Sequence, residues 1–164
     1  MSSNLLKRRQ EVAKFYSTKT YGNDRGLSCC FRQWRADHSH CSLLHGYSIG
    51  IKLVFECDTL DDKNWCMDFG GLKEFKTWAD WMFDHTLIIA RDDPEFDTLS
   101  ALDGKLAELR VVDGVGCEMF AKMCFEKLDD MLTKGETRYP INPSVRIKSA
   151  EVFEHGANSA IYER

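Results

Sequence analysis

The chain has 164 residues, of which 43% are hydrophobic and 12% aromatic. This length suits one well-packed domain and is too short for two of ordinary size. A formal net charge of -4 argues against a nucleic-acid-binding surface. No apolar run approaches the roughly 20 residues of a membrane-spanning helix, and the first residues lack a signal peptide's apolar core. We expect a cytoplasmic protein that binds neither nucleic acid nor membrane.

Residues 1–26 are interpreted as an N-terminal arm or helix, because residues 5–16 show a weak amphipathic pattern. Residues 27–164 are interpreted as a single domain. The seven cysteines are an odd number, scattered over a chain without a secretion signal, so we expect thiols and not a disulfide framework.

The hydrophobic pattern of this domain predicts strands and helices in a simple order. Strands are expected over residues 27–34, 46–56, 144–154 and 157–162, and helices over 72–82 and 116–132. Between the helices, residues 90–97 are expected to form a surface loop and 108–112 a short extended segment. The order of two strands, two helices and two strands predicts an α+β fold, an antiparallel four-stranded sheet with two helices on one face.

One stretch concentrates reactive side chains. Residues 37–47, Asp-His-Ser-His-Cys-Ser-Leu-Leu-His-Gly-Tyr, hold three of the five histidines and one of the seven cysteines, and they lead into the strictly alternating strand. A metal site, or a cysteine activated by histidine, is one interpretation. The other is a polar loop with solvated histidines and a small buried thiol.

Four segments, residues 41–48, 67–73, 83–87 and 152–162, together resemble the 6-pyruvoyl-tetrahydropterin synthase/6-carboxytetrahydropterin synthase family. A fifth, Gly-Cys-Glu-Met-Phe-Ala at 116–121, is similar to that family's helix start. The resemblance implies a tunnelling fold, in which trimers close their sheets into an oligomeric barrel and two trimers usually stack. It therefore implies a homo-trimer or homo-hexamer with active sites between subunits.

The resemblance also implies a pterin substrate, 7,8-dihydroneopterin triphosphate. The short Cys-x-x-x-His spacing is more similar to the 6-carboxytetrahydropterin branch, which feeds 7-deazaguanine and queuosine synthesis. By the same resemblance Cys41 is the general base, and Asp84 with His85 completes its proton relay. Glu154 matches the anchor of the pterin ring, and Glu118, kept at the helix start, is assigned to substrate binding with it. The relay is chemically sensible, because a thiol becomes a useful base near neutral pH beside an imidazole held by a carboxylate.

The sequence departs from the family at the positions of the metal ligands. The resemblance implies zinc held by three histidines, with a coordination position left for substrate oxygens. Here Phe31 stands at or near the first histidine and Tyr47 replaces the last, so His45 alone matches. Either the metal is lost or the site is rebuilt from neighbours, and we expect the second. The donors available beside His45 are His40, His38 and Cys30, or Cys29 in place of Cys30.

Three functions are therefore weighed. The leading hypothesis is a 6-carboxytetrahydropterin synthase-like lyase that uses the Cys41 relay and a zinc ion. The second is a pterin- or purine-binding protein that keeps the ring pocket without metal-dependent catalysis. The third is another reaction of the same fold, such as an aldolase- or epimerase-like step on a related pterin.

Overall fold

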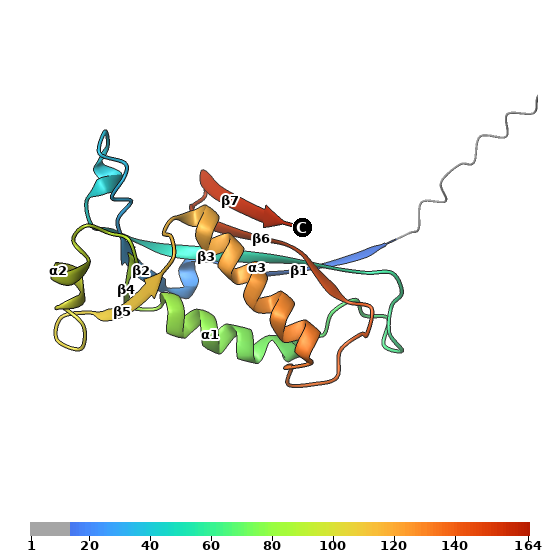
Figure 1. Ribbon diagram of the computed structural model, residues 1–164. Helices are drawn as coiled ribbons and strands as arrows, with labels where there is room; N and C mark the ends of the chain where they lie inside the picture. The colour runs from blue at the N-terminus through green and yellow to red at the C-terminus, as the bar shows by residue number, and fades with distance from the viewer. Residues whose placement is uncertain (1–13) are drawn as a thin grey trace, which may run out of the picture.

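A computed structural model describes residues 14–164 of the chain (Figure 1). In this part of the chain one mixed sheet has the strand order β5-β4-β2-β3-β6-β7, and β1 also pairs with β3. The strands are β1 (Phe15–Tyr21), β2 (Leu27–Phe31), β3 (His45–Cys57), β4 (Thr86–Ala90), β5 (Glu108–Val112), β6 (Arg146–His155) and β7 (Asn158–Glu163). The α-helices are α1 (Lys73–Phe83), α2 (Phe96–Ser100) and α3 (Cys117–Lys134). Short 3-10 helices are η1 (Asn23–Arg25), η2 (His40–Ser42) and η3 (Phe69–Leu72).

Strand β3 organises the sheet. Its second half pairs with β1 and its first half with β2, while β6 pairs along its other edge. The apolar residues of its alternating pattern are fully buried, as the period of two along a strand requires: Ile49, Ile51, Leu53 and Phe55. The first residues of β3 therefore lie at one end of the sheet, beside the end of β2.

Helices α1 and α3 lie on the same face of the sheet (Figure 1). The apolar stripe of α3 is buried against that face, with Phe120 and Leu128 fully inaccessible. Phe120 meets Phe31 of β2 edge to face, with ring centroids 5.1 Å apart. The helix ends at Gly135, whose φ of 69° is a conformation that glycine adopts without strain. The C-terminal end of β2 is thus packed onto the first turns of α3.

The α+β class and the two long helices are confirmed, and the four expected strands correspond to β2, β3, β6 and β7. A wholly antiparallel sheet of four strands is wrong, because β1, β4 and β5 also join it and the β2–β4 and β4–β5 pairs are parallel. All five residues of β4 are buried, so this strand lacks the alternation that marks a half-buried one. The expected short extended segment at 108–112 is β5.

Two further expectations differ from the structure. The loop expected at 90–97 is a turn that passes into α2 at Phe96. The arm or helix expected over 5–16 lies mostly outside the described residues, and its last two positions begin β1. Tyr21 of β1 pairs with Ile51 of β3, so residues 15–21 belong to the sheet.

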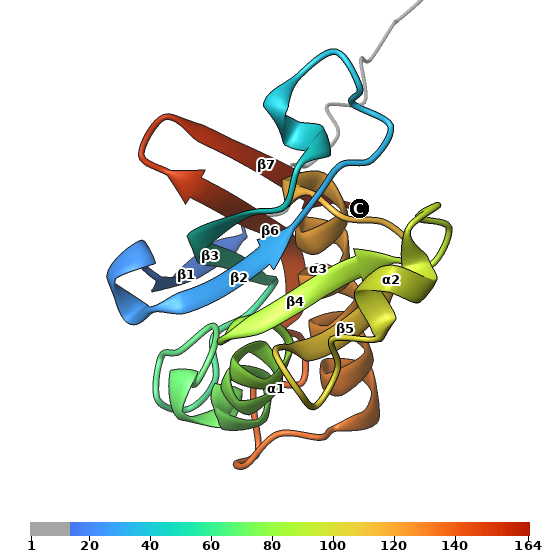
Figure 2. The ribbon, with the colours of Figure 1, turned by 90° about the vertical axis from the view of Figure 1, so that its left-hand side faces the viewer.

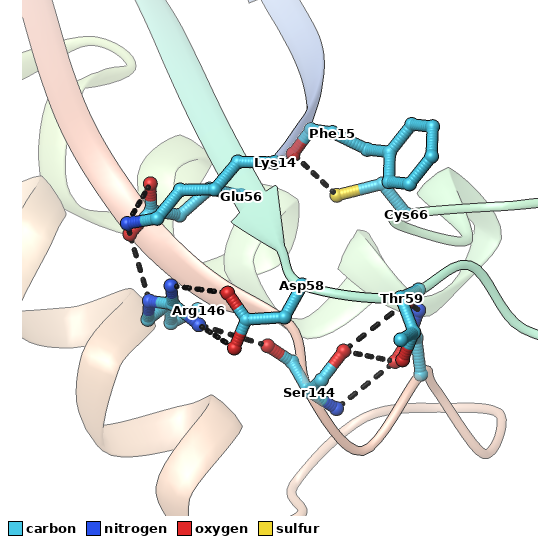
Figure 3. A network of polar contacts seen from close by, with 9 residues as sticks. Lys14, Phe15, Glu56, Asp58, Thr59, Cys66, Ser144 and Arg146 are labelled. Atoms are coloured by element: carbon cyan, nitrogen blue, oxygen red, sulfur yellow. Dashed lines mark hydrogen bonds and ion pairs between the residues drawn. The ribbon is translucent and has the colours of Figure 1, made fainter. Parts of the chain in front are cut away.

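A polar network joins β1, β3 and β6 at the end of β3 farther from residues 37–47 (Figure 3). Glu56 is 7% exposed and accepts hydrogen bonds from Arg146 Nε at 2.7 Å and Lys14 Nζ at 3.3 Å. Arg146 also donates to Asp58. Burial would raise the pKa of Glu56, but the hydrogen bonds from Arg146 and Lys14 outweigh it and hold that pKa below its ordinary value. No helix of residues 14–164 combines the length and apolar character needed to cross a membrane.

Candidate active site

The reactive stretch forms a loop between β2 and β3 that projects beyond the sheet (Figure 2). Phe31 and His45 are paired across the two strands, which closes the base of the loop. Cys41 lies exposed in η2, where its amide donates to the capping oxygen of Ser39 at 3.2 Å and its carbonyl accepts from Gln33 at 2.7 Å. The Cys41 thiol is therefore open to solvent on a backbone held by local hydrogen bonds.

A buried ion pair anchors this loop to the turn after β4. The Arg32 guanidinium donates to both carboxylate oxygens of Asp93, through Nε at 2.8 Å and Nη2 at 2.5 Å. The Asp93 side chain is 1% exposed, and its pKa is lowered by the hydrogen bond from Arg32. The same guanidinium donates to the carbonyl of Ser42 at 3.3 Å. The segment next to Cys41 is therefore fixed to the body of the protein.

His45 has a defined orientation. Its Nδ1 lies 2.7 Å from the carbonyl oxygen of Leu43, which can only accept, so Nδ1 carries the proton and Nε2 is the free acceptor. The imidazole lies 5.5 Å from the Phe31 ring and 5.3 Å from the Tyr47 ring, centroid to centroid. The His45 imidazole, with its free Nε2 lone pair, therefore lies between two aromatic rings.

Glu154 joins this end of the sheet from β6. Its carbonyl accepts from Asn23 Nδ2 at 3.2 Å, and the same amide donates to Ser48 at 2.7 Å, which ties η1 to β3 and β6. The Glu154 carboxylate lies near the thiol of Cys117 at the start of α3. Burial, then the negative charges of Glu154 and Glu118, raise the pKa of Cys117 to about 12. Cys117 therefore stays a neutral thiol near neutral pH.

Tyr47 connects these groups. Its pKa is raised first by burial and then by the negative charge of Glu154, and the thiols of Cys41 and Cys117 also lie near its phenol. Glu118 is exposed in the first turn of α3, directly after Cys117. The fold thus gathers Cys41, Tyr47 and Glu154 at one end of β3.

Asp84 and His85 form a separate pair at the end of α1. His85 Nδ1 lies 2.6 Å from Asp84 Oδ1, and the imidazole is 85% exposed. His85 has a φ of 55°, while Thr86 Oγ1 donates to Met82 at 2.9 Å and fixes the chain after it. The carboxylate orients the imidazole and leaves Nε2 facing solvent.

This pair does not meet Cys41 within one chain. Cys29 is paired with Thr86 in the parallel β2–β4 ladder, which places His85 beside Ser28 near the start of β2. Cys41 lies beyond Phe31, at the other end of that strand. At a rise of about 3.3 Å per residue, the three steps from Ser28 to Phe31 alone separate them by roughly 10 Å.

The metal ligands expected from the sequence are not brought together either. Among residues 14–164, no three His, Cys, Asp or Glu side chains are grouped so as to hold a metal ion. His38 and His40 are exposed on the loop. Cys30 packs with Leu87 in a smaller apolar cluster, because successive residues of a strand face opposite ways and its neighbour Phe31 faces the main core. One chain therefore does not bring the expected donors together, and the rebuilt site stays a prediction.

Comparison with known proteins identifies the family of the chain. The model of the family described as 6-pyruvoyl tetrahydropterin synthase matches residues 23–164. The chain belongs to this family. A 6-carboxy-5,6,7,8-tetrahydropterin synthase of Rickettsia conorii is 32% identical over 75 residues, 40% of this chain and 54% of that protein. One of Rickettsia typhi is 36% identical over 56 residues, 34% of this chain and 41% of that protein. The matched segments thus span about half the length of these curated relatives or less.

Solved structures confirm the tunnelling fold. An uncharacterized protein from Wolinella succinogenes superposes with a TM-score of 0.75 at 20% identity, covering 93% of this chain and 99% of that one. The 6-pyruvoyl tetrahydropterin synthase of Plasmodium falciparum gives a TM-score of 0.58 at 17% identity, covering 92% and 98%. At these identities the likeness concerns the fold.

The end of β2 and the start of β3, with Phe31, His45 and Tyr47, are here called the strand mouth. The zinc implied by the family does not fit the side chains there. The β2–β3 register places Phe31 opposite His45, and Tyr47 stands two residues further on the same face. The three positions converge, but one holds a hydrocarbon ring and one a phenol that burial keeps protonated. Among residues 14–164 no three metal-binding side chains are grouped, and one imidazole beside a phenyl ring and a phenol is a poor zinc site.

Two contributors to this site escaped the sequence interpretation. Cys117 was given no role in the sequence interpretation, and in the structure it is a core thiol that lies near the Glu154 carboxylate. The signal was its position directly before Glu118, at the helix start that resembles the family's. Asn23 lies in the segment interpreted as an arm, and its three carbonyl contacts to β3 and β6 depend on tertiary structure alone.

Proposed function

We propose that this protein is a pterin lyase of the 6-carboxytetrahydropterin synthase type, acting on 7,8-dihydroneopterin triphosphate. The observation that carries the proposal is the gathering of Cys41, Tyr47 and Glu154 at one end of the sheet, where β3 begins beside the ends of β2 and β6. A carboxylate there can accept two parallel hydrogen bonds from a pterin's ring amide and exocyclic amine. The exposed Cys41 side chain nearby can, as a thiolate, take a proton from the substrate's side chain and become a thiol.

In the proposed site the proton relay crosses between subunits. Cys41 of one chain acts with Asp84 and His85 of a neighbour, because the register keeps these residues apart within one chain. Two observations support a neighbour: the Asp84–His85 pair is exposed, and β1 and β7 each pair along one edge only among the described residues. Open strand edges invite pairing with another copy. We propose a homo-trimer or homo-hexamer.

The residues supply acid–base chemistry. Cys41, as a thiolate, takes a proton from the substrate's side chain. His85, oriented by Asp84, donates a proton to the forming product. Tyr47 presents a protonated phenol that can donate a hydrogen bond to a substrate oxygen. No step is assigned to zinc, because the donors at the strand mouth do not fit it.

A second function remains, that of a pterin-binding protein without turnover. It is favoured by Phe31 and Tyr47, which stand where the family resemblance implies two zinc-binding histidines. Incubating the protein with 7,8-dihydroneopterin triphosphate and following product by chromatography separates the two. The lyase predicts product from the parent, none from Cys41→Ala, and none from Glu154→Gln at low substrate. Tight pterin binding with no turnover by the parent would establish the binder instead.

A further inference from the structure

A basic hollow lies between β1, η1 and the start of α1, in the corner where Figure 2 shows the blue β1–η1 segment near the green η3–α1 segment. Its volume is about 530 Å³. Four cationic side chains and one acidic side chain line it: Lys19, Arg25, Lys73, Lys76 and Asp24. Like charges gathered around one cavity repel each other unless a negatively charged ligand enters.

Most of these cations have no acidic partner. Arg25 pairs with Asp80 of α1, whereas the three lysines form no ion pair with any of residues 14–164. Lysines elsewhere do pair, for example Lys134 with Asp130 at 2.7 Å. The hollow therefore has positive charge that the described part of the chain does not neutralise.

The floor of the hollow is a buried phenol. Tyr21 is 7% exposed and lines the cavity, and its hydroxyl makes no hydrogen bond with the described residues. Lys19 Nζ and Arg25 Cζ lie 5.5 Å and 5.9 Å from the centre of its ring. Burial raises the pKa of Tyr21 to about 12, so the hydroxyl remains a hydrogen-bond donor near neutral pH. An unpartnered donor among cations suits an anionic oxygen.

We propose that this hollow, formed by Lys19, Arg25, Lys73, Lys76 and Tyr21, binds a phosphate chain. Lysine ammonium groups bind phosphate as point charges. Cations on both walls of the cavity call for a ligand with several charged groups and not a single carboxylate. The positive end of the α1 dipole lies at the same wall and adds to the attraction.

The hollow also has a geometric relation to the Asp84–His85 pair. Lys76, Asp80 and Asp84 follow one another at four-residue spacing, so they lie along one face of α1 and its end. At about 1.5 Å per residue, Lys76 and Asp84 are separated by roughly 12 Å along the helix axis. The phosphate chain can belong to the substrate of the neighbouring site, an origin that rests on the proposed function, or to a free polyphosphate.

Calorimetric titration with inorganic tripolyphosphate tests the binding itself. The variant Lys19→Gln/Lys73→Gln/Lys76→Gln should bind at least about tenfold more weakly than the parent, because it removes three ligand charges. The control Lys63→Gln/Lys122→Gln/Lys134→Gln removes the same charge from lysines that already have acidic partners, and should bind like the parent. Tyr21→Phe should weaken binding several-fold through loss of one donor. Equal weakening in both triple variants, or no saturable binding by the parent at millimolar concentration, overturns the proposal.

Steady-state kinetics then separates the two origins of the phosphate chain. If the chain belongs to the substrate, the hollow variant raises KM for 7,8-dihydroneopterin triphosphate with little change in kcat, and tripolyphosphate competes with substrate. If it is a free polyphosphate, KM is unchanged and inhibition is not competitive. A parent without turnover contradicts the proposed function alone, because the titration still decides the hollow. Matching circular dichroism spectra and melting temperatures exclude misfolded variants.

Discussion

The ring of Phe31 faces the imidazole of His45 across the β2–β3 ladder, with centroids 5.5 Å apart. Phe31 is 1% exposed and also packs against Phe120, so it belongs to the core as much as to the strand mouth. At one of the two positions where a metal site would need a further nitrogen ligand, this chain has a packed hydrocarbon ring. In the proposed site the chemistry therefore depends on protons and hydrogen bonds.

The donor set predicts how metal binding responds to substitution. Protein purified without added zinc should contain far less than one zinc per chain, while Phe31→His/Tyr47→His should bind close to one equivalent, because three imidazoles then converge. Atomic emission after gel filtration measures both. Tyr47→His alone is the control and should gain little metal. One tightly held zinc in the parent would show that other ligands complete the site.

The proposed pterin pocket predicts a loss of pterin affinity in Glu154→Gln. The amide turns one acceptor oxygen into a donor facing the donors of the pterin, which should cost about 1.5–3 kcal/mol of binding free energy. Glu151→Gln is a matched control on the same strand, where Glu151 accepts from Ser159 at 2.6 Å and, by alternation, faces the other side of the sheet. Fluorescence titration with a pterin measures all three proteins. Equal affinities would mean that Glu154 is only structural.

The loop anchor predicts a combined effect on stability and turnover. Asp93→Asn leaves Arg32 without its buried partner and should lower the free energy of unfolding by roughly 3 kcal/mol. It should also reduce turnover, since Arg32 holds the carbonyl next to Cys41. Asp92→Asn changes the adjacent, exposed carboxylate and should cost less than about 1 kcal/mol. Urea unfolding at one fixed protein concentration gives the comparison, and similar costs for both variants would contradict the anchoring role.

The network at the far end of β3 predicts a dependence of stability on pH. Because the pKa of Glu56 is lowered in the folded state, its contribution is present above the unfolded pKa and is lost as pH falls through the folded pKa. Glu56→Gln should therefore lower the free energy of unfolding by about 1–3 kcal/mol at neutral pH. In acid the parent and variant should converge. A difference that stays constant down to acid pH would show that the charge of Glu56 is not what matters.

Local pattern predicted the parts of the fold that expose one face to water and bury the other. Strand β3 alternates and α3 has a 3.6-residue stripe, and both were predicted within a few residues. Strand β4 was missed because five consecutive buried residues carry no period. Strand β1 was missed because its side chains are mostly exposed or half-buried, and only its pairing with β3 defines it.

The candidate site likewise has one part that the local sequence predicts and another that only the tertiary structure reveals. Cys41, His45 and Tyr47 are close in sequence, and a loop leading into a strand brings them to one place. The contact between Cys117 and Glu154 joins residues from α3 and β6, which no spacing in the sequence reveals. The expected ligand Cys30 is not brought to His45 within one chain, because it adjoins Phe31 on a strand and faces the opposite way.

The central claim is that Cys41 of one subunit works with the Asp84–His85 pair of another. The most direct test mixes two inactive variants, Cys41→Ala and His85→Ala, by co-expression with different affinity tags and isolation of mixed oligomers. Each variant alone should be inactive on 7,8-dihydroneopterin triphosphate. The mixed oligomer should regain a substantial fraction of parental turnover, because some interfaces then combine an intact Cys41 with an intact His85. Mixed oligomers as inactive as the separate variants, although the parent is active, would contradict a site shared between subunits.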